Sequence, residues 1–338
     1  MIDQRMRTLL SLLILTAFTN SVFALDICSS EQRACDFIER ASPGINIDQP
    51  LISLSDGRFA PRLAATDFDN ICNVFHSIRL AIRWSPDQAD FLQQLSAIKD
   101  LSNTIIRKGC LVVIDYHKFE AIETIDGQNE SSIELFSSRW AAIASNFVQN
   151  ENSIALELLN EPSSNVPGRY LNRLYAVALH RIRFIGFSGT ILLGPRNWNT
   201  AESLRELTIP SDDNVGASVH TYSPMSFTHQ GANWLKHSPP PGVTCCTDEQ
   251  LQNLKKQIAV AGNWQSSTHH PVLFTEIGVI RYADPHSRAQ YLKEISTVMR
   301  EHSIGFQVWD YDKAFSIYNT AKQEWEPTLL DALSIKKQ

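Results

Sequence analysis

The sequence lacks any cluster of basic residues. Its 338 residues include 30 lysines and arginines against 36 aspartates and glutamates, which gives a formal net charge of −6. Binding to nucleic acid or to an anionic membrane surface requires clustered Lys and Arg. The composition therefore argues against both kinds of partner and fits an uncharged one better.

The apolar run near the N-terminus is too short to be a membrane span. Leu9 to Phe18 covers about 10 residues, whereas a membrane-spanning helix needs about 20. The run follows Arg5 and Arg7 and precedes Val22-Phe23-Ala24, which offers the small or apolar residues that a signal peptidase reads. We therefore predict that residues 1–24 are a secretory signal peptide and that the mature protein is secreted or periplasmic.

Sequence patterns for bound metals and nucleotides are also missing. No CxxC pair or nearby histidine has the spacing of a zinc site. No glycine-rich phosphate loop follows the first predicted strand, which argues against a nucleotide-binding, doubly wound sheet. We expect neither a cofactor nor a metal.

The sequence contains only six cysteines, and all of them follow the predicted cleavage site. Disulfides persist in the oxidising compartments that secreted proteins reach, although six cysteines allow 15 pairings. Cys72 just precedes one predicted strand and Cys110 opens the next, so both should lie at the amino ends of neighbouring strands. We predict the pairs Cys72–Cys110 and Cys28–Cys35, and leave the adjacent Cys245 and Cys246 as either a vicinal bridge or two free thiols.

Short apolar runs alternate with helical periodicity along the chain. Runs that are apolar on both faces are typical of parallel strands buried on both sides. Eight such runs are present: Gly44–Ile47, Val74–Ile82, Cys110–Asp115, Ile154–Leu159, Thr190–Gly194, Val215–Val219, Val272–Thr275 and Ile304–Trp309. Helical stretches between them include Asp87–Lys108, Glu134–Gln149, Pro167–Phe187 and Pro285–His302.

This alternation predicts an α/β fold, a (β/α)8 TIM barrel, as a single domain over residues 25–338. A barrel typically takes about 250 residues and grows by loop insertion, so about 314 residues fit one domain. Ser238-Pro239-Pro240-Pro241-Gly242 is too short for an interdomain linker. We interpret it as part of an extended loop over the active face.

Polar residues stand where the predicted strands end, which is where barrel enzymes place their catalytic groups. Each of them, taken alone, could have an ordinary structural role. Because they come together from six strand ends, a shared functional site is the better interpretation. They are Arg79, His117, Asn160, Glu161, His220, Tyr222, Glu276 and Trp309. His269-His270 precedes a strand and therefore belongs to the opposite face, so we assign it no catalytic role.

Two of these residues are carboxylic acids delivered by different apolar strands. Glu161 lies in Leu158-Leu159-Asn160-Glu161-Pro162, and Glu276 ends Pro271-Val272-Leu273-Phe274-Thr275-Glu276. A pair of carboxyl groups that flank a glycosidic bond is the requirement of glycoside hydrolysis. The sequence therefore predicts sugar chemistry.

The chain resembles glycoside hydrolase family 5, the cellulase family of the retaining (β/α)8 clan. The resemblance runs from Gly44-Ile45-Asn46 to Trp309; Asn160-Glu161-Pro162 is similar to the family's acid/base motif, and Glu276 matches its nucleophile. His220-Thr221-Tyr222-Ser223-Pro224 is similar to a segment common in bacterial members. One position departs from the pattern, because Lys118 follows His117 where many members carry a second His or Asn.

The resemblance implies a secreted retaining endo-β-1,4-glucanase that needs no metal. Arg79 and the Tyr222 hydroxyl would hold Glu276 ionised, and an anionic neighbour would raise the pKa of Glu161. His117 and His220 would orient the sugar and the acid.

We expect one asparagine and up to three tryptophans to contact the sugar. Asn160 would bond the sugar 2-hydroxyl, and Trp309 would form a platform beneath the cleaved sugar. Trp198 and Trp234 either extend this platform or belong to the core. The partner we expect is a β-linked polysaccharide or oligosaccharide, bound by a monomer.

Other functions remain open. A β-mannanase or another β-glucanase of the same family is the nearest alternative. A non-catalytic carbohydrate-binding barrel is disfavoured because both Glu161 and Glu276 are present, and a metal-dependent barrel hydrolase because the first strand has no HxH.

Overall fold

The computed structural model describes residues 33–118 and 129–336. The predicted signal peptide, residues 1–24, lies outside these ranges and stays a prediction. Within the described residues, no helix combines the length and the apolar character that crossing a bilayer requires.

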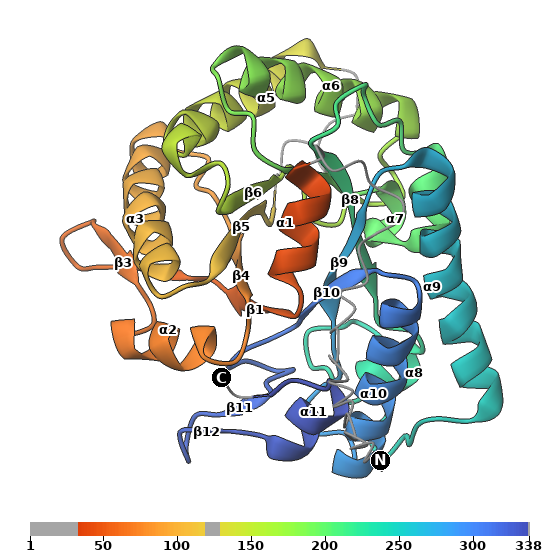
Figure 1. Cartoon of the computed structure of the whole chain (residues 1–338). Coiled ribbons are helices and arrows are strands. Elements are labelled where there is room, and N and C mark those ends of the chain that lie inside the picture. Colours follow the sequence, from red (N-terminus) through yellow and green to blue (C-terminus); the bar gives the residue numbers. More distant parts are fainter. Residues whose placement is uncertain (1–32, 119–128, 337–338) are drawn as a thin grey trace, which may run out of the picture.

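Eight parallel strands close into a barrel, as the alternation of runs predicted (Figure 1). Around the barrel the hydrogen-bonded order is β1-β10-β9-β8-β7-β6-β5-β4, and β4 pairs with β1. The strands are β1 (Gly44–Asp48), β4 (Ser77–Ile82), β5 (Leu111–Tyr116), β6 (Ile154–Glu157), β7 (Ile191–Leu193), β8 (Val215–Thr221), β9 (Val272–Ile277) and β10 (Gly305–Val308). Each corresponds to one of the eight predicted runs.

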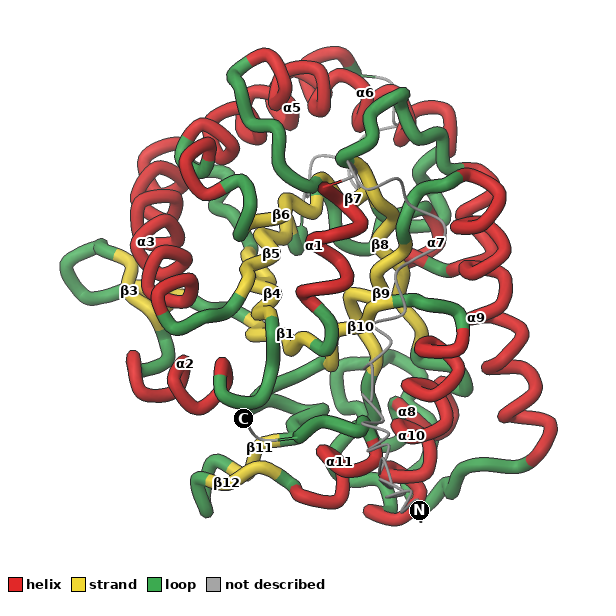
Figure 2. Tube along the Cα trace, in the orientation of Figure 1, coloured by secondary structure: helices red, strands yellow, loops and turns green. Residues whose placement is uncertain are grey.

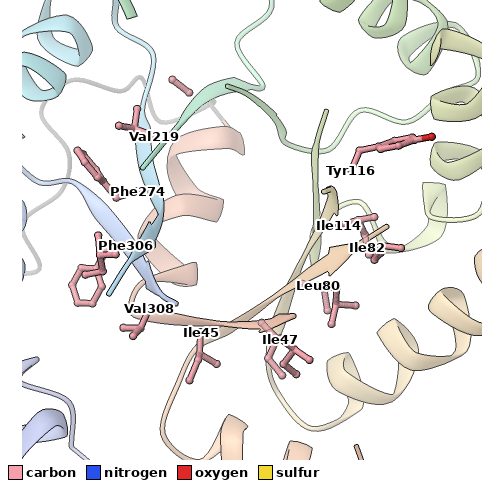
Figure 3. Packing of buried hydrophobic residues seen from close by; sticks show 14 of the residues in the cluster. Ile45, Ile47, Leu80, Ile82, Ile114, Tyr116, Val219, Phe274, Phe306 and Val308 are labelled. Carbon is pink, nitrogen blue, oxygen red and sulfur yellow. The ribbon is translucent and has the colours of Figure 1, made fainter. Parts of the chain in front are cut away.

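Alternate residues of each strand face outward to the helices. Ile45, Leu80, Ile114 and Phe274 belong to one large hydrophobic cluster between the barrel and its surrounding helices, and Figure 3 shows several of its members around the strands. Because a strand alternates its faces, the residues between these positions point into the barrel.

The amino end of the barrel interior is mostly apolar, and a helix that the sequence did not predict closes it. In Figure 1, α1 (Arg33–Ala41) lies across the ring of strands. Phe37 and Ile38 of α1 form a second cluster with inward-facing strand residues such as Leu111 and Val113. Ser77 and Gln307 also face inward here: Gln307 donates to Ser77, and Ser77 donates to the carbonyl of Ala41 in α1. The charged inward residues, such as Arg79 and Glu276, lie toward the carboxyl end.

Long helices surround the barrel (Figure 2), and each contributes buried residues to the core. They are α3 (Gln88–Arg107), α5 (Glu130–Ser145), α6 (Gly168–Phe184), α9 (Asp248–Thr268) and α10 (Pro285–Glu301). All but α9 match predicted helical stretches. Side chains cap four of them. Asp87 accepts from two backbone amides at the start of α3, Thr247 forms a capping box at the start of α9, and Asn129 and Asp284 each accept from one backbone amide at the starts of α5 and α10.

Short elements complete the described chain. The loops carry two antiparallel hairpins, β2 (Leu51–Ser53) with β3 (Phe59–Pro61) and β11 (Tyr318–Asn319) with β12 (Glu324–Trp325). The remaining helical segments are α2 (Ala65–Cys72), α7 (Arg196–Asn199), α8 (Met225–Thr228), α11 (Pro327–Ala332) and two 3₁₀ turns, Val148–Asn150 and Ala201–Glu206.

The predicted Cys72–Cys110 disulfide is present, with the two Cα atoms 5.4 Å apart. Cys72 is the last residue of α2, and Cys110 directly precedes β5, so the bridge lies at the amino end of the barrel. Of the two alternatives for the adjacent pair, Cys245 and Cys246 are bonded to each other. Cys28 lies outside the described residues, so its pairing with Cys35 stays a prediction.

Removing the Cys72–Cys110 bridge should destabilise the protein without touching its chemistry. A Cys72→Ala/Cys110→Ala variant should lose about 2 to 5 kcal/mol of unfolding free energy, since the bridge restricts the unfolded chain. Its turnover should stay near wild type because the bridge lies at the opposite end of the barrel from the polar residues. Denaturant unfolding and a non-reduced peptide digest check this, and a peptide that links Cys72 to another cysteine would contradict it.

Candidate active site

A fully buried arginine organises the carboxyl end of the barrel. Arg79 of β4 contacts two oxygens of Glu157 at 2.6 and 3.1 Å and one of Glu276 at 2.8 Å. Nη2, which also contacts Glu157, lies 3.0 Å from Asp115. A buried guanidinium needs such anionic partners, because an unpaired charge in the interior costs several kcal/mol.

Arg79 also binds two amides. It donates to Oδ1 of Asn46 at 2.9 Å and to Oδ1 of Asn160 at 2.7 Å. The Asn46 amide nitrogen donates to the backbone carbonyls of Thr275 and Val308, which ties the network to β9 and the end of β10. For Asn160, the bond to Arg79 leaves the amide nitrogen as the donor available to a ligand.

Glu276 is held by two donors. One of its oxygens accepts from Arg79 and the other from the Tyr222 hydroxyl at 2.7 Å. A shift in strand register places His220 opposite Glu276, although Val219 lies opposite Phe274. This bulge aims two successive residues, Thr275 and Glu276, at the barrel interior.

Glu161 faces the cleft from a strained backbone position. Its φ of 46° lies in the left-handed region, which a non-glycine residue occupies at a cost and which is frequent at functional sites. One of its oxygens lies 3.0 Å from Nδ1 of His220. Burial raises the pKa of Glu161, and the negative charge of Glu157 adds to this, against the opposing effects of His117 and Arg79. The anionic neighbour is thus Glu157 of β6.

The two acids are close together. One atom from each of Glu161, His220 and Glu276 lies within 4.8 Å of the others. Carboxyl groups of retaining glycosidases are about 5 to 5.5 Å apart, and those of inverting ones about 6.5 to 9.5 Å. The spacing therefore belongs to the shorter class.

These three side chains also form the one group of His, Cys, Asp and Glu in the described residues that is close enough to hold a metal ion. However, the Arg79 guanidinium already donates to Glu276 there. A bound cation would be repelled by that charge, so the donor set fits a carboxylate pair better than a metal site.

His117 and Trp309 form a second unit beside the acids. Nδ1 of His117 lies 2.8 Å from Asp115, and the ring stacks on Trp309 with an interplanar angle of 3°. Burial lowers the pKa of His117 to about 4 and raises that of Asp115 to about 7. His117 is therefore neutral near pH 7, and the Trp309 ring is fixed beside Glu161 and Glu276 in the cavity lining.

Two cavities open side by side at this end of the barrel. The first, of about 320 Å³, is lined by both acids, His117, Asn160 and Trp309. The second, of about 720 Å³, is lined by Glu161, Trp198, His220 and Leu235 among others. Both include Glu161, Tyr222, His229 and Trp234, so together they form a cleft with the acids near its middle.

Trp198 and Trp234, for which the sequence allowed either a cleft or a core position, both line this cleft. Trp198 is 53% exposed and Trp234 is 51% exposed, so neither is a core residue. Trp198 lies in a left-handed turn, because residues 197–199 all have φ near 58°. Its amide donates to the carbonyl of Pro162, which joins the turn to the segment that carries Glu161.

Several groups at the site were missed by sequence reasoning. Glu157 and Asp115 are charged residues inside otherwise apolar strands, and this signal could have marked them as partners of a buried cation. Asn199 approaches His220 only through the left-handed turn, which the sequence does not indicate. The first cavity is also lined by Asp48 at the end of β1 and by the loop residues Arg83, Asp310 and Lys313, and no sequence pattern marked these four.

Fold and site together define a (β/α)8 barrel with a closely spaced pair of carboxyl groups at its carboxyl end. The family model for cellulase, glycosyl hydrolase family 5, matches residues 55–315. The chain belongs to this family and is a glycoside hydrolase by membership, as the resemblance predicted.

Curated relatives are distant. Endoglucanase H of Acetivibrio thermocellus is 24% identical over 324 residues, which cover 90% of this chain and 34% of that protein. Cellodextrinase A of Ruminococcus flavefaciens is 28% identical over 222 residues, which cover 63% of this chain and 66% of that protein. The chain thus spans about one third to two thirds of the length of these relatives.

Solved structures of other proteins share the fold of this chain over nearly their whole length. Thermotoga maritima Cel5A in complex with mannotriose has a TM-score of 0.78 and 26% identity, covering 88% of this chain and 100% of that one. The same enzyme in complex with cellobiose has a TM-score of 0.79 and 25% identity, covering 88% and 99%. That neighbour therefore accepts both a gluco- and a manno-configured ligand.

Proposed function

We propose that the protein is a retaining endo-β-1,4-glucanase in which Glu276 is the nucleophile and Glu161 the acid/base. The proposal rests above all on the two carboxyl groups, whose oxygens lie within 4.8 Å of each other. This leaves no room for the water that an inverting enzyme places between nucleophilic carboxylate and sugar.

The two acids have the environments that their roles require. Arg79 and Tyr222 both donate to Glu276, which stabilises the carboxylate that attacks the anomeric carbon. The raised pKa of Glu161 keeps its proton available for the leaving oxygen. As the sugar–oxygen bond breaks, Glu161 gives its proton to the departing chain and Glu276 forms an ester with the sugar.

Water completes the cycle. Glu161, now ionised, takes a proton from a water molecule that attacks the glycosyl ester, and Glu276 leaves as a carboxylate. Esterification removes the negative charge of Glu276, which favours ionisation of nearby Glu161. The product keeps the configuration of the substrate.

The shape of the cleft supports cleavage inside a chain. Cavities lie on both sides of Glu161 and Tyr222, so sugars can bind on each side of the broken bond. Trp309 offers an apolar ring face in the first cavity, and Trp198 and Trp234 offer two in the second. The C–H faces of β-linked pyranoses pack on such rings.

β-Mannan is the second candidate substrate. Most of the matching curated proteins are called endoglucanases, such as that of Acetivibrio thermocellus, while the Thermotoga maritima neighbour was solved with mannotriose as well as cellobiose. We favour glucan because endoglucanases predominate among the relatives.

A substrate panel tests the proposal. Carboxymethylcellulose, glucomannan, mannan and β-1,3-glucan should be compared, with product sizes followed over time. We expect a rapid fall in the viscosity of carboxymethylcellulose with mixed oligosaccharide products. Faster cleavage of pure mannan would favour the second candidate, and release of disaccharide alone from the first time point would refute the endo mode.

We also propose that the protein reaches its substrate by secretion, on the strength of residues 1–24. N-terminal sequencing of protein recovered outside the cytoplasm should begin after Ala24. Retention of the full N-terminus would contradict the cleavage.

A further inference from the structure

A chain of hydrogen bonds joins the buried network of Arg79 to the acid Glu161. Oε1 of Glu157 lies 2.6 Å from Oγ of Ser218, which lies 2.6 Å from Oγ1 of Thr275. Thr275 Oγ1 lies 2.9 Å from Nε2 of His220, and Nδ1 of His220 lies 3.0 Å from Glu161. Ser218 and Thr275 are fully buried, so water does not supply alternative partners.

The number of protons fixes the direction of every bond in this chain. Glu157 accepts from Arg79 through both oxygens and is a carboxylate, so the hydrogen in its 2.6 Å contact belongs to Ser218. Ser218 has no second hydrogen, so the hydroxyl hydrogen of Thr275 lies in the 2.6 Å contact with Ser218 rather than in the longer 3.4 Å contact with Oε1 of Glu157. Thr275 then has only an acceptor left for His220, which must donate from Nε2.

A neutral imidazole carries a single ring proton, and Nε2 holds it. Nδ1 is therefore an acceptor, and the hydrogen of its contact with Glu161 comes from the carboxylic acid. Any other assignment leaves one of the two 2.6 Å oxygen pairs without a hydrogen between them.

We propose that Ser218 and Thr275 are positioning residues that fix the Nε2–H tautomer of His220, so that His220 accepts the acid proton of Glu161. The inference rests on the proposed role of Glu161 as general acid. According to this proposal, Glu161 stays protonated because of the hydrogen-bond relay Glu157–Ser218–Thr275–His220, and not because of its burial alone.

Neutrality of His220 has independent support. Burial lowers its pKa to about 4, despite the opposing charge of Glu276. The charged and titratable groups around His220 and Glu161 come from five elements or the loops after them: Arg79 from β4, Asp115 and His117 from β5, Glu157 from β6, Tyr222 after β8 and Glu276 from β9.

The tautomer depends on the hydroxyl pair because other groups favour the opposite one. An oxygen of Glu276 lies 3.7 Å from Nδ1 and would attract a proton there. Nδ2 of Asn199 donates to Ser218 at 3.1 Å and lies 3.4 Å from Nε2. Without the Thr275 hydroxyl, Asn199 can donate to Nε2, and the ring proton then moves to Nδ1.

Nitrogen NMR of the wild-type protein tests the tautomer directly and does not depend on turnover. With ¹⁵N-labelled histidine, Nε2 of His220 should resonate as a protonated nitrogen and Nδ1 as an unprotonated one. The signals are assigned by their loss in His220→Gln. A proton on Nδ1 in the active pH range would overturn the proposal, whereas an Nε2 proton in a protein without glycosidase activity would refute the proposed function and leave the relay intact.

Two variants test the consequence for Glu161. Thr275→Val removes the hydroxyl at nearly constant shape, and Ser218→Ala removes the acceptor of Thr275 without contacting His220 or Glu161. In the first, Asn199 becomes the donor to Nε2. In the second, the freed Thr275 hydroxyl does, because it lies 2.9 Å from Nε2 and 3.4 Å from its other acceptor, Oε1 of Glu157. Both changes put the ring proton on Nδ1, which then donates to the Glu161 carboxylate and lowers the pKa of Glu161.

The readout is the basic limb of the pH dependence of kcat/KM. A general acid works while protonated, so activity is lost as pH rises through its pKa, and a lower pKa moves this loss to lower pH. We expect a shift of about one pH unit in both variants, as for the gain of one hydrogen bond to a charged group. Thr275→Ser should restore the wild-type profile. A fall in kcat with an unmoved basic limb in Ser218→Ala would reduce the relay to a packing role and overturn the proposal.

Discussion

Glu276→Ala should lower turnover of polysaccharide by about 10⁴-fold or more, because the variant has no group to attack the anomeric carbon. The fold should persist, since Arg79 keeps its contacts with Glu157 and Asp115. Azide can occupy the space of the lost carboxylate and attack an activated aryl β-glycoside from the same side. The product should then be the inverted α-glycosyl azide.

The configuration of that product decides the role of Glu276. A β-glycosyl azide would require a remaining nucleophile elsewhere in the site and would exclude the assignment. Glu301→Ala is a matched control, because it removes an exposed carboxylate at the last residue of α10, outside both cavities. It should retain wild-type turnover and show no response to azide.

Glu161→Ala should affect substrates according to their leaving groups. Cleavage of cello-oligosaccharides should slow by about 10² to 10⁴-fold, since a sugar alkoxide leaves only when protonated. Aryl glycosides with nitrophenol leaving groups should form the glycosyl-enzyme at nearly the wild-type rate. Burst kinetics separate this first step from hydrolysis of the intermediate, which also needs Glu161 as a base.

The pH profile gives a second measurement for Glu161. Burial raises its pKa, so the protonated, active form persists to higher pH than for an exposed glutamate, and activity falls as pH rises through that pKa. The basic limb on oligosaccharides should disappear in Glu161→Ala. Equal slowing of both substrate types in the first step would show that another group is the acid.

The barrel could be predicted because buried parallel strands leave a strong pattern. All eight runs became strands, since segments apolar on both faces favour parallel strands that are buried on both sides. α1 was not predicted, because its role depends on where it lies in the fold. It closes the amino end of the barrel by packing against inward residues such as Leu111. α9 was not among the predicted stretches, and only five of its 21 residues are buried.

The members of the site could be predicted for a related reason. Barrel strands deliver the residues that follow them to one end, so Arg79, His117, Glu161 and Glu276 were expected together, and the structure brings them around one cleft. Their individual catalytic roles remain predictions for the experiments above. Trp198 was undecided by sequence, because a tryptophan after a strand is as compatible with a core as with a cleft.

By itself, the sequence determined the barrel, the family and the pairing of two carboxyl groups, since each depends on residue type and on order along the chain. Only the tertiary structure decided which protons those groups share. The bulge at Thr275 and Glu276 places a hydroxyl and a carboxylate on the same side of β9, and the left-handed turn at residues 197–199 brings Asn199 to His220. Hydrogen-bond direction follows from distances of a few ångströms between residues that are 55 to 61 positions apart, and no local pattern encodes such distances.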